Sequence, residues 1–151
     1  MKDVIQKIFV EKFNIEPLIV RSPGRINIIG EHTDYNNGFV LPAAIDKAIY
    51  IAVSKRNDDL ISLHAANFNE DITVRISEIA PSKQNWPNYI LGIVDQLKKI
   101  NKNITGFNAV VDGDVPLGAG LSSSAAVECA TAFALNELFK LQLDKMQMVK
   151  L

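Results

Sequence analysis

Residues 116–126 read Pro-Leu-Gly-Ala-Gly-Leu-Ser-Ser-Ser-Ala-Ala, a glycine-rich turn that leads directly into a helix-forming stretch. Gly118 and Gly120 can adopt backbone angles closed to other residues, so consecutive amide groups can point into one concavity. Ser122 to Ser124 open the following helix, where unpaired amides and the positive end of the helix dipole favour an anion. The stretch therefore predicts a phosphate site whose hydroxyls could also ligate magnesium.

An alternative explanation is a tight glycine turn followed by an ordinary serine helix cap. The loop is not a Walker loop, because the sequence contains no Gly-Lys-Ser or Gly-Lys-Thr. A phosphate bound here would therefore need a basic residue from elsewhere in the chain.

The segments that flank this loop predict a strand before it, at 107–111, and a long helix after it, at 122–141. The helix is apolar nearly all round, which predicts a central helix that needs more cover than this short chain can supply. Cys129 lies in this helix among apolar residues, so we expect a buried, unreactive thiol. As the single cysteine, it cannot form an intramolecular disulfide.

The rest of the chain predicts alternating helical and extended segments. These are an amphipathic helix ending near Asn14, short strands at 18–20 and 26–29, a polar turn at 34–38, three strands at 45–54, 60–64 and 72–76, and a helix at 86–100. We expect the three strands to form an antiparallel sheet on which the helix at 86–100 packs. Asp144 predicts the N-cap of a last helix that continues for only about two turns, so the sequence is expected to be truncated.

Composition limits the class of protein. The 151 residues fit one globular domain, and a formal charge of -1 gives no reason to expect a nucleic acid partner. The start Met1-Lys2-Asp3-Val4 does not resemble a secretory signal, and no apolar run approaches membrane-spanning length. These features predict a cytoplasmic protein with no membrane partner.

A polar cluster surrounds a short apolar segment between residues 24 and 38. Glu31, His32 and Asp34 can accept and donate hydrogen bonds to a polyhydroxylated ligand, and Arg25 could pair with a phosphoryl group or an acid. A network of internal salt bridges is one alternative. A metal site at His32 and Asp34 is another, although two ligands are too few for a structural zinc site.

Together, Gly-Arg-x-Asn-x-Ile-Gly-Glu-His-Thr-Asp-Tyr-Asn at 24–36 and Pro-Leu-Gly-Ala-Gly-Leu-Ser-Ser-Ser-Ala-Ala at 116–126 closely resemble the galactokinases of the GHMP kinase superfamily. The resemblance spans nearly the whole chain. It implies an α+β fold, with residues 1–151 forming a GHMP kinase N-terminal domain without its C-terminal domain. The implied fold resembles the second domain of a small-subunit ribosomal protein and has a mixed sheet and a left-handed βαβ crossover.

The resemblance also implies roles for individual residues. Glu31, His32, Thr33 and Asp34 would bind the sugar, and Arg25 would stabilise the transferred phosphoryl group and lower the pKa of the catalytic acid. The residues that would bind ATP are Gly118, Ala119, Gly120, Leu121, Ser122, Ser123 and Ser124, with Trp86 near the adenine. Ser124 would ligate Mg2+. For Trp86 a core position is an equally good explanation.

The implied function is ATP-dependent phosphorylation of galactose to galactose 1-phosphate by the intact protein. In the family, the aspartate that accepts the sugar proton follows the phosphate helix, and it would lie beyond Leu151 in the missing C-terminal part. Asp112, Asp114 and Asp144 do not match its position, so we expect the isolated chain to lack turnover. Alternatives are a non-catalytic sensor of galactose and ATP, a kinase for N-acetylgalactosamine or arabinose, and a piece that binds nothing and self-associates.

Overall fold

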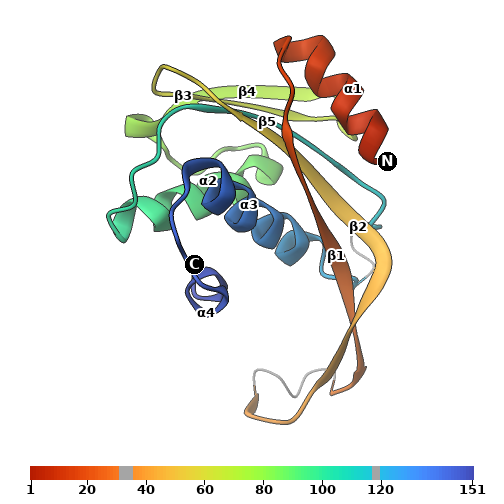
Figure 1. Cartoon of the computed structure of the whole chain (residues 1–151). Coiled ribbons are helices and arrows are strands. Elements are labelled where there is room, and N and C mark those ends of the chain that lie inside the picture. Colours follow the sequence, from red (N-terminus) through yellow and green to blue (C-terminus); the bar gives the residue numbers. More distant parts are fainter. Residues whose placement is uncertain (31–35, 117–119) are drawn as a thin grey trace.

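The computed structural model describes residues 1–30, 36–116 and 120–151, and it contains a five-stranded sheet with helices on both faces (Figure 1). In chain order, the elements are α1 (Lys2–Phe13), β1 (Leu18–Ile29), β2 (Leu41–Lys55), β3 (Leu60–Ala65), β4 (Glu70–Arg75), the 3-10 helix η2 (Ile76–Glu78), α2 (Asn85–Lys99), β5 (Phe107–Gly113), α3 (Ser123–Phe139) and α4 (Lys145–Val149). The predicted α+β class and nearly all of the predicted elements are therefore confirmed.

The strand order is β1-β2-β5-β3-β4, and β3 and β5 run parallel while the other neighbours are antiparallel. A mixed sheet is thus confirmed. The prediction of one antiparallel sheet from the segments at 45–54, 60–64 and 72–76 is partly wrong. The last two segments pair antiparallel as β3 and β4, but the first two are not neighbours, because β5 lies between β2 and β3. The first four residues of β5, 107–110, are all buried, as expected of a strand covered on both faces.

Alternate side chains of β2 lie on opposite faces of the sheet. Ile51 and Val53 point into the main core with the apolar sides of α2 and α3, whereas Ala52 between them contacts α1. On the α1 side, Ile5 and Phe9 are fully buried against Ala52 and a valine of β5. The sheet is therefore the middle layer, and α2 packs on it as predicted.

The first strand differs from the expectation of two short strands around Ser22-Pro23-Gly24. A single strand, β1, passes through this point with a break in register: Pro23 pairs with Ala48 and Arg25 with Ala44, so Gly24 alone lies opposite residues 45–47. The extra residues on β2 form an irregularity of the bulge type, and the guanidinium of Arg21 donates to the carbonyl of Asp46 at 2.8 Å. The sequence predicts two strands here because proline and glycine usually mark turns.

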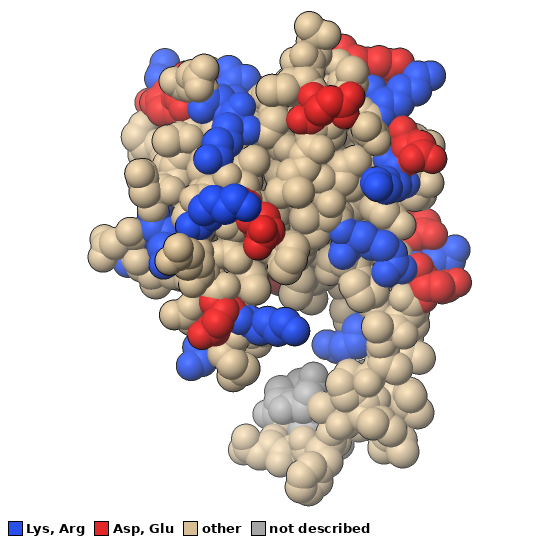
Figure 2. Space-filling view, viewed as in Figure 1, with Lys and Arg blue, Asp and Glu red and all other residues tan. Residues whose placement is uncertain are grey.

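Beyond the bulge, β2 no longer pairs with β5 and pairs only with β1, and the two strands leave the sheet as a twisted ribbon (Figure 1). Figure 2, viewed as in Figure 1, shows charged side chains over the body of the molecule, whereas the described residues at the end of the ribbon, 26–30 and 36–43, are uncharged. Ile28, Ile29 and Leu41 are exposed there. Residues 36–38 of the predicted turn at 34–38 lie at this end, and residues 34 and 35 are outside the described residues.

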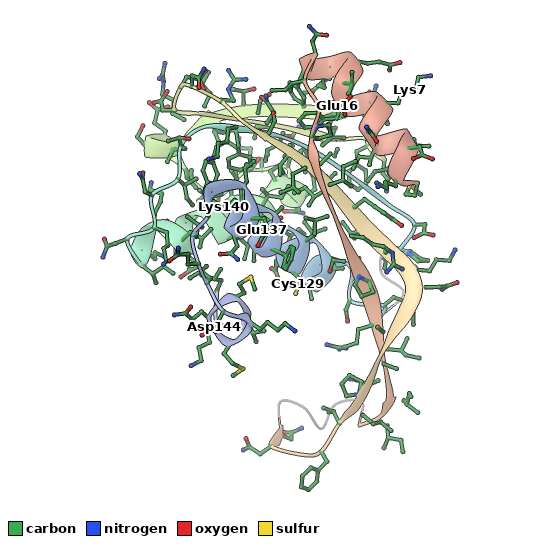
Figure 3. All side chains as sticks on the ribbon, viewed as in Figure 1. Lys7, Glu16, Cys129, Glu137, Lys140 and Asp144 are labelled. Atoms are coloured by element: carbon green, nitrogen blue, oxygen red, sulfur yellow. The ribbon has the colours of Figure 1, made fainter. Side chains whose placement is uncertain are left out.

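The long apolar helix, α3, is shorter than the predicted range because residues in the left-handed region end it on both sides, Ser122 with φ 58° and Lys140 with φ 55°. Its alanine face packs against β1 and β2, and α2 and α4 flank it. Phe133 nevertheless stays 47% exposed. The buried position expected for Cys129 is wrong, because its side chain lies on an exposed part of α3 (Figure 3).

The predicted last helix is confirmed as α4, and Asp144 caps it. Its carboxylate accepts from the amide of Gln147 at 2.8 Å, while the side chain of Gln147 accepts from the amide of Asp144 at 2.9 Å. This reciprocal pair is a capping box. Within the described ranges, every helix is too short or too polar to span a bilayer.

Candidate functional site

A cavity of about 590 Å³ opens where the start of α3 faces the start of α2 and one end of β3 and β5. Its lining combines hydroxyl, amide and carboxylate groups with aromatic and aliphatic side chains. The lining residues are Ile49, Ala65, Asn67, Phe68, Asn85, Trp86, Tyr89, Val111, Asp112, Val115, Gly120, Leu121, Ser122, Ser123, Ser124 and Val127. A concave apolar surface with a few convergent polar groups is typical of a small-molecule site.

The start of α3 contributes the polar side of this cavity. Gly120 has φ 70° and Ser122 φ 58°, so the chain turns twice through the left-handed region immediately before the helix. Ser122 is the N-cap residue, yet its hydroxyl makes no capping hydrogen bond, and Ser123 and Ser124 line the cavity beside it. The first turn of α3 therefore places hydroxyls and unpaired backbone amides at the cavity, where the sequence predicts an anion.

The approach to the loop is anchored on β2. Asp114 accepts from the amide of Ala48 at 2.8 Å and donates its own amide to the carbonyl of the same residue at 3.1 Å. The hydrogen bond from Ala48 is the main reason that the pKa of Asp114 lies below its usual range, with a smaller effect from Lys47 at 3.3 Å. Asp114 therefore holds the loop in place.

The far side of the loop is packed against the same strand. Val115, before the loop, and Ala126, in the first turns of α3, form a small buried cluster with Ile49 of β2. The two ends of the glycine-rich stretch are thus fixed on one strand. This arrangement keeps the start of α3 aimed at the cavity.

Arg25 comes to this region from β1. Its amide donates to the carbonyl of Leu121 at 3.1 Å, and Gly24 beside it is buried. The structure therefore brings together two motifs that are separated by about 90 residues in the sequence, at 24–25 and 120–124. The Arg25 side chain is exposed.

Trp86 belongs both to the main core and to the lining of the cavity. Its ring is half-buried and packs on the main core, and it also lines the cavity opposite the serines. The indole N–H donates to the carboxylate of Glu70 at 2.7 Å, which fixes the orientation of the ring.

The lining residues that the sequence analysis did not propose include Asn67, Phe68, Tyr89 and Asp112. Asn67 donates to the carbonyl of Gly113 at 3.0 Å and so ties the β3–β4 turn to the end of β5. No local pattern marks Asn67, Phe68 and Asp112, because they meet only after β5 pairs with β3. Tyr89 follows Trp86 by one helical turn and could have been found from that spacing.

Several predicted site residues lie outside the described residues. These are Glu31, His32, Thr33 and Asp34 of the sugar cluster and Gly118 and Ala119 of the loop. Their neighbours Gly30 and Asn36 belong to the end of the β1–β2 ribbon.

Cys129 lies away from this cavity. Although exposed, its thiol has a pKa above the usual range because the surrounding protein removes water from it, and the charge of Glu128 adds to this effect. A raised pKa lowers the thiolate fraction, so the expectation of an unreactive thiol is supported while that of burial is not.

Comparison with known proteins gives matches to both motifs. Residues 7–55 match the galactokinase galactose-binding signature, and residues 88–151 match the GHMP kinases N terminal domain. The galactokinase of Roseiflexus sp. (strain RS-1) is 43% identical over 136 residues, which are 89% of this chain and 35% of that protein. The galactokinase of Staphylococcus saprophyticus is 45% identical over 134 residues, which are 86% of this chain and 35% of that protein.

Among solved structures, the Lactococcus lactis galactokinase in complex with galactose superimposes with a TM-score of 0.92 and 34% identity. The superposition covers 99% of this chain and 40% of that one. The chain thus spans 35–40% of the length of these three relatives.

Proposed function

Because the chain belongs to the galactokinase family of the GHMP kinase superfamily, we propose that it carries the galactose site and the ATP phosphate site of a sugar kinase. The whole protein would transfer the terminal phosphoryl group of ATP to galactose and form galactose 1-phosphate. Residues 1–151 would be the N-terminal domain of that protein, acting with a C-terminal part in the cytoplasm.

One observation carries the nucleotide half of this proposal. The serines that open α3 and the aromatic ring of Trp86 line the same cavity from opposite elements, α3 and α2. A helix N-terminus favours phosphate, and an aromatic face suits the adenine. The cavity therefore matches a nucleotide in both size and polarity.

The matches to residues 7–55 and 88–151 support a proposed role for each motif. Residues Gly118, Ala119, Gly120, Leu121, Ser122, Ser123 and Ser124 would surround the phosphates. Glu31, His32, Thr33 and Asp34 would hold the sugar hydroxyls, which carboxylates and a histidine suit chemically. Arg25 would stabilise charge on the transferred phosphoryl group, because phosphoryl transfer depends mainly on positioning and charge stabilisation.

Magnesium fits the groups that line the cavity. Mg2+ prefers oxygen ligands, keeps several waters and is usually held by one or two protein oxygens together with the phosphates. In the part of the chain that the structure describes, no cluster of three His, Cys, Asp or Glu could hold a metal alone. Ser124 and Asp112 both line the cavity, and Ser124 would be the metal ligand. Bound Mg2+ would neutralise charge on the phosphates.

Turnover needs one further group. In galactokinases, the aspartate that accepts the proton from the sugar hydroxyl follows the phosphate helix. Asp112 and Asp114 precede that helix, and Asp144 caps α4, so none of them takes this position. We therefore propose that the 151 residues bind both ligands without transferring phosphate. Release of ADP from ATP and galactose by this chain alone would contradict this part of the proposal.

The nucleotide site can be tested directly on the 151-residue chain. Trp86 is the single tryptophan, so its fluorescence reports on the cavity. We expect a saturable change in emission on titration with ATP and Mg2+, and isothermal titration calorimetry should give the same dissociation constant. Galactose, glucose, N-acetylgalactosamine and arabinose are compared in parallel, and preference for galactose is expected. A chain that binds neither ATP nor any of these sugars would refute the proposal.

Asp34→Ala separates the two halves of the site. Loss of the carboxylate should abolish galactose binding, because a site built to accept hydrogen bonds from sugar hydroxyls loses its main acceptor. ATP binding should remain within about twofold, since the phosphates contact the start of α3. Asp46→Asn, on the exposed part of β2, is the control. Unchanged galactose affinity in Asp34→Ala would favour the internal salt-bridge explanation of the cluster.

A further inference from the structure

The strand that carries the sugar signature also makes a direct backbone contact with the phosphate loop. As β1 forms one edge of the sheet, it has a strand neighbour on one side only. At the bulge, the amide of Arg25 donates to the carbonyl of Leu121 at 3.1 Å. This hydrogen bond joins residues 96 positions apart. Both of its groups belong to the backbone, so neither side chain takes part in it.

Gly24 leaves the space that this contact needs. A Cβ atom at Gly24 would lie 3.0 Å from the Leu121 carbonyl oxygen and 3.1 Å from Cδ1 of Ile45. The Leu121 oxygen belongs to the backbone, so it cannot turn away as a flexible side chain could. Any side chain at position 24 would therefore push the loop from β1.

Displacement of Leu121 would be passed on to the serines. Ser122 follows directly, holds a left-handed conformation with φ 58°, and accepts the first hydrogen bond of α3 from Ala126 at 3.0 Å. Because a residue in this conformation has little freedom to adjust, a shift of the Leu121 carbonyl moves the Ser122 backbone and the hydroxyls that line the cavity. Small shifts of positioning groups have large effects on sites that depend on exact geometry.

We propose that Gly24 and the amide of Arg25 position the phosphate loop, so that nucleotide affinity is set from the strand of the sugar signature. Gly24 is thus a positioning residue for ATP, although its sequence neighbours serve the sugar. This inference rests on the proposed nucleotide site and adds to it the residue that holds the loop.

Gly24→Ala tests the inference. We expect ATP to bind roughly tenfold more weakly or worse, because the serines no longer converge, while galactose affinity stays within about twofold. Gly92→Ala is the matched control, because a Cβ atom at Gly92 in α2 meets nothing within 4 Å. It should change neither affinity. A purely structural role for Gly24 would instead lower both affinities together and would overturn the inference.

The double variant Gly24→Ala with Ile45→Ala separates the two contacts. Removal of the Ile45 side chain relieves one of them and leaves the contact with the Leu121 carbonyl. ATP affinity should therefore remain low. Its recovery would show that crowding with Ile45 is responsible and would overturn the inference.

The unsubstituted chain offers a readout that does not depend on how the variants fold. Hydrogen exchange of the Arg25 amide should slow by about tenfold or more when ATP and Mg2+ bind, because the loop then holds its acceptor in place. Galactose should have a smaller effect. No change with ATP would overturn the inference. If the unsubstituted chain binds ATP but Gly24→Ala binds it equally well, only the inference fails, whereas absence of ATP binding in the unsubstituted chain refutes the proposed function and the inference with it.

Discussion

At the residue scale, the carboxyl group of Asp58 is made much more acidic by its hydrogen-bond partners. Arg56 donates two hydrogen bonds to its carboxylate, at 2.8 and 2.7 Å, and the amide of Leu60 donates a third at 3.1 Å. The guanidinium of Arg56 is the main cause that lowers the pKa of Asp58 to about 2. Arg56 also donates to Asn108 of β5 at 2.8 Å, so the pair links the β2–β3 turn to the centre of the sheet.

This pKa predicts how stability depends on acidity. The pKa of Asp58 is lower in the folded chain than in the unfolded chain. Its contribution to the free energy of unfolding is therefore fully present above about pH 4 and is lost as the pH falls through about 2. The free energy of unfolding in urea, measured from pH 5 to pH 2, should therefore fall less steeply in Asp58→Asn than in the unsubstituted chain. Gly92→Ala, which removes no titratable group, should keep the original slope. Equal slopes in all three proteins would contradict the assigned pKa.

At the scale of elements, local signals decide where helices end. Asn14 adopts φ 52° after α1, and its amide donates to the carbonyl of Val10, so the helix ends where the sequence predicted. The capping box of Asp144 starts α4 in the same local way. In contrast, β1 continues through Pro23 and Gly24. As an edge strand it needs hydrogen bonds to β2 on one side only, so proline and glycine do not end it.

Asp144→Ala should destabilise the chain by about 1 kcal/mol, the usual effect of losing an N-cap side chain. The amide of Gln147 loses its acceptor, so its hydrogen exchange should accelerate more than that of amides in α3. Denaturation in urea gives the first quantity, and exchange followed by NMR gives the second. Lys145→Ala, an exposed neighbour, should change neither. Unchanged exchange at Gln147 in Asp144→Ala would show that the capping box does not hold α4.

At the scale of the whole molecule, one main core links all layers on the α2 and α3 side of the sheet. It includes residues of every strand and of the helices α2 and α3, and Met148 of α4 packs at its edge. Since the start of α3 and the start of α2 both belong to this core, the proposed nucleotide site forms only when the domain is folded. Ligand binding and folding are therefore coupled through mass action.

We accordingly expect ATP with Mg2+ at about one hundred times its dissociation constant to stabilise the chain by about 2.7 kcal/mol. For a domain of this size, that corresponds to a rise in Tm of about 5–10 °C. Differential scanning fluorimetry with an external dye, or circular dichroism at 222 nm, gives the shift. Galactose should produce its own shift, which Asp34→Ala should remove. Absence of a shift with ATP would mean that the cavity does not bind nucleotide in the folded chain.

The amino-acid sequence by itself determined the elements and the two motifs. The apolar period of α2, the alternation in β4 and the caps of α1 and α4 depend on residues a few positions apart, so local reading is sufficient for them. The glycines and serines at 118–124 predicted an anion site for the same reason, and the family followed from two motifs in one order.

The tertiary structure decided which elements meet. Burial on both faces places β5 between β2 and β3, and this pairing brings Asp112 and Asn67 to the cavity that the loop residues line. Exposure of Cys129 likewise depends on which side of α3 the sheet covers. The contact of Gly24 and Arg25 with Leu121 joins distant parts of the chain at a sheet edge, where no local period or cap carries a signal. Long-range burial and edge pairing, rather than local preference, therefore set the geometry of the phosphate loop.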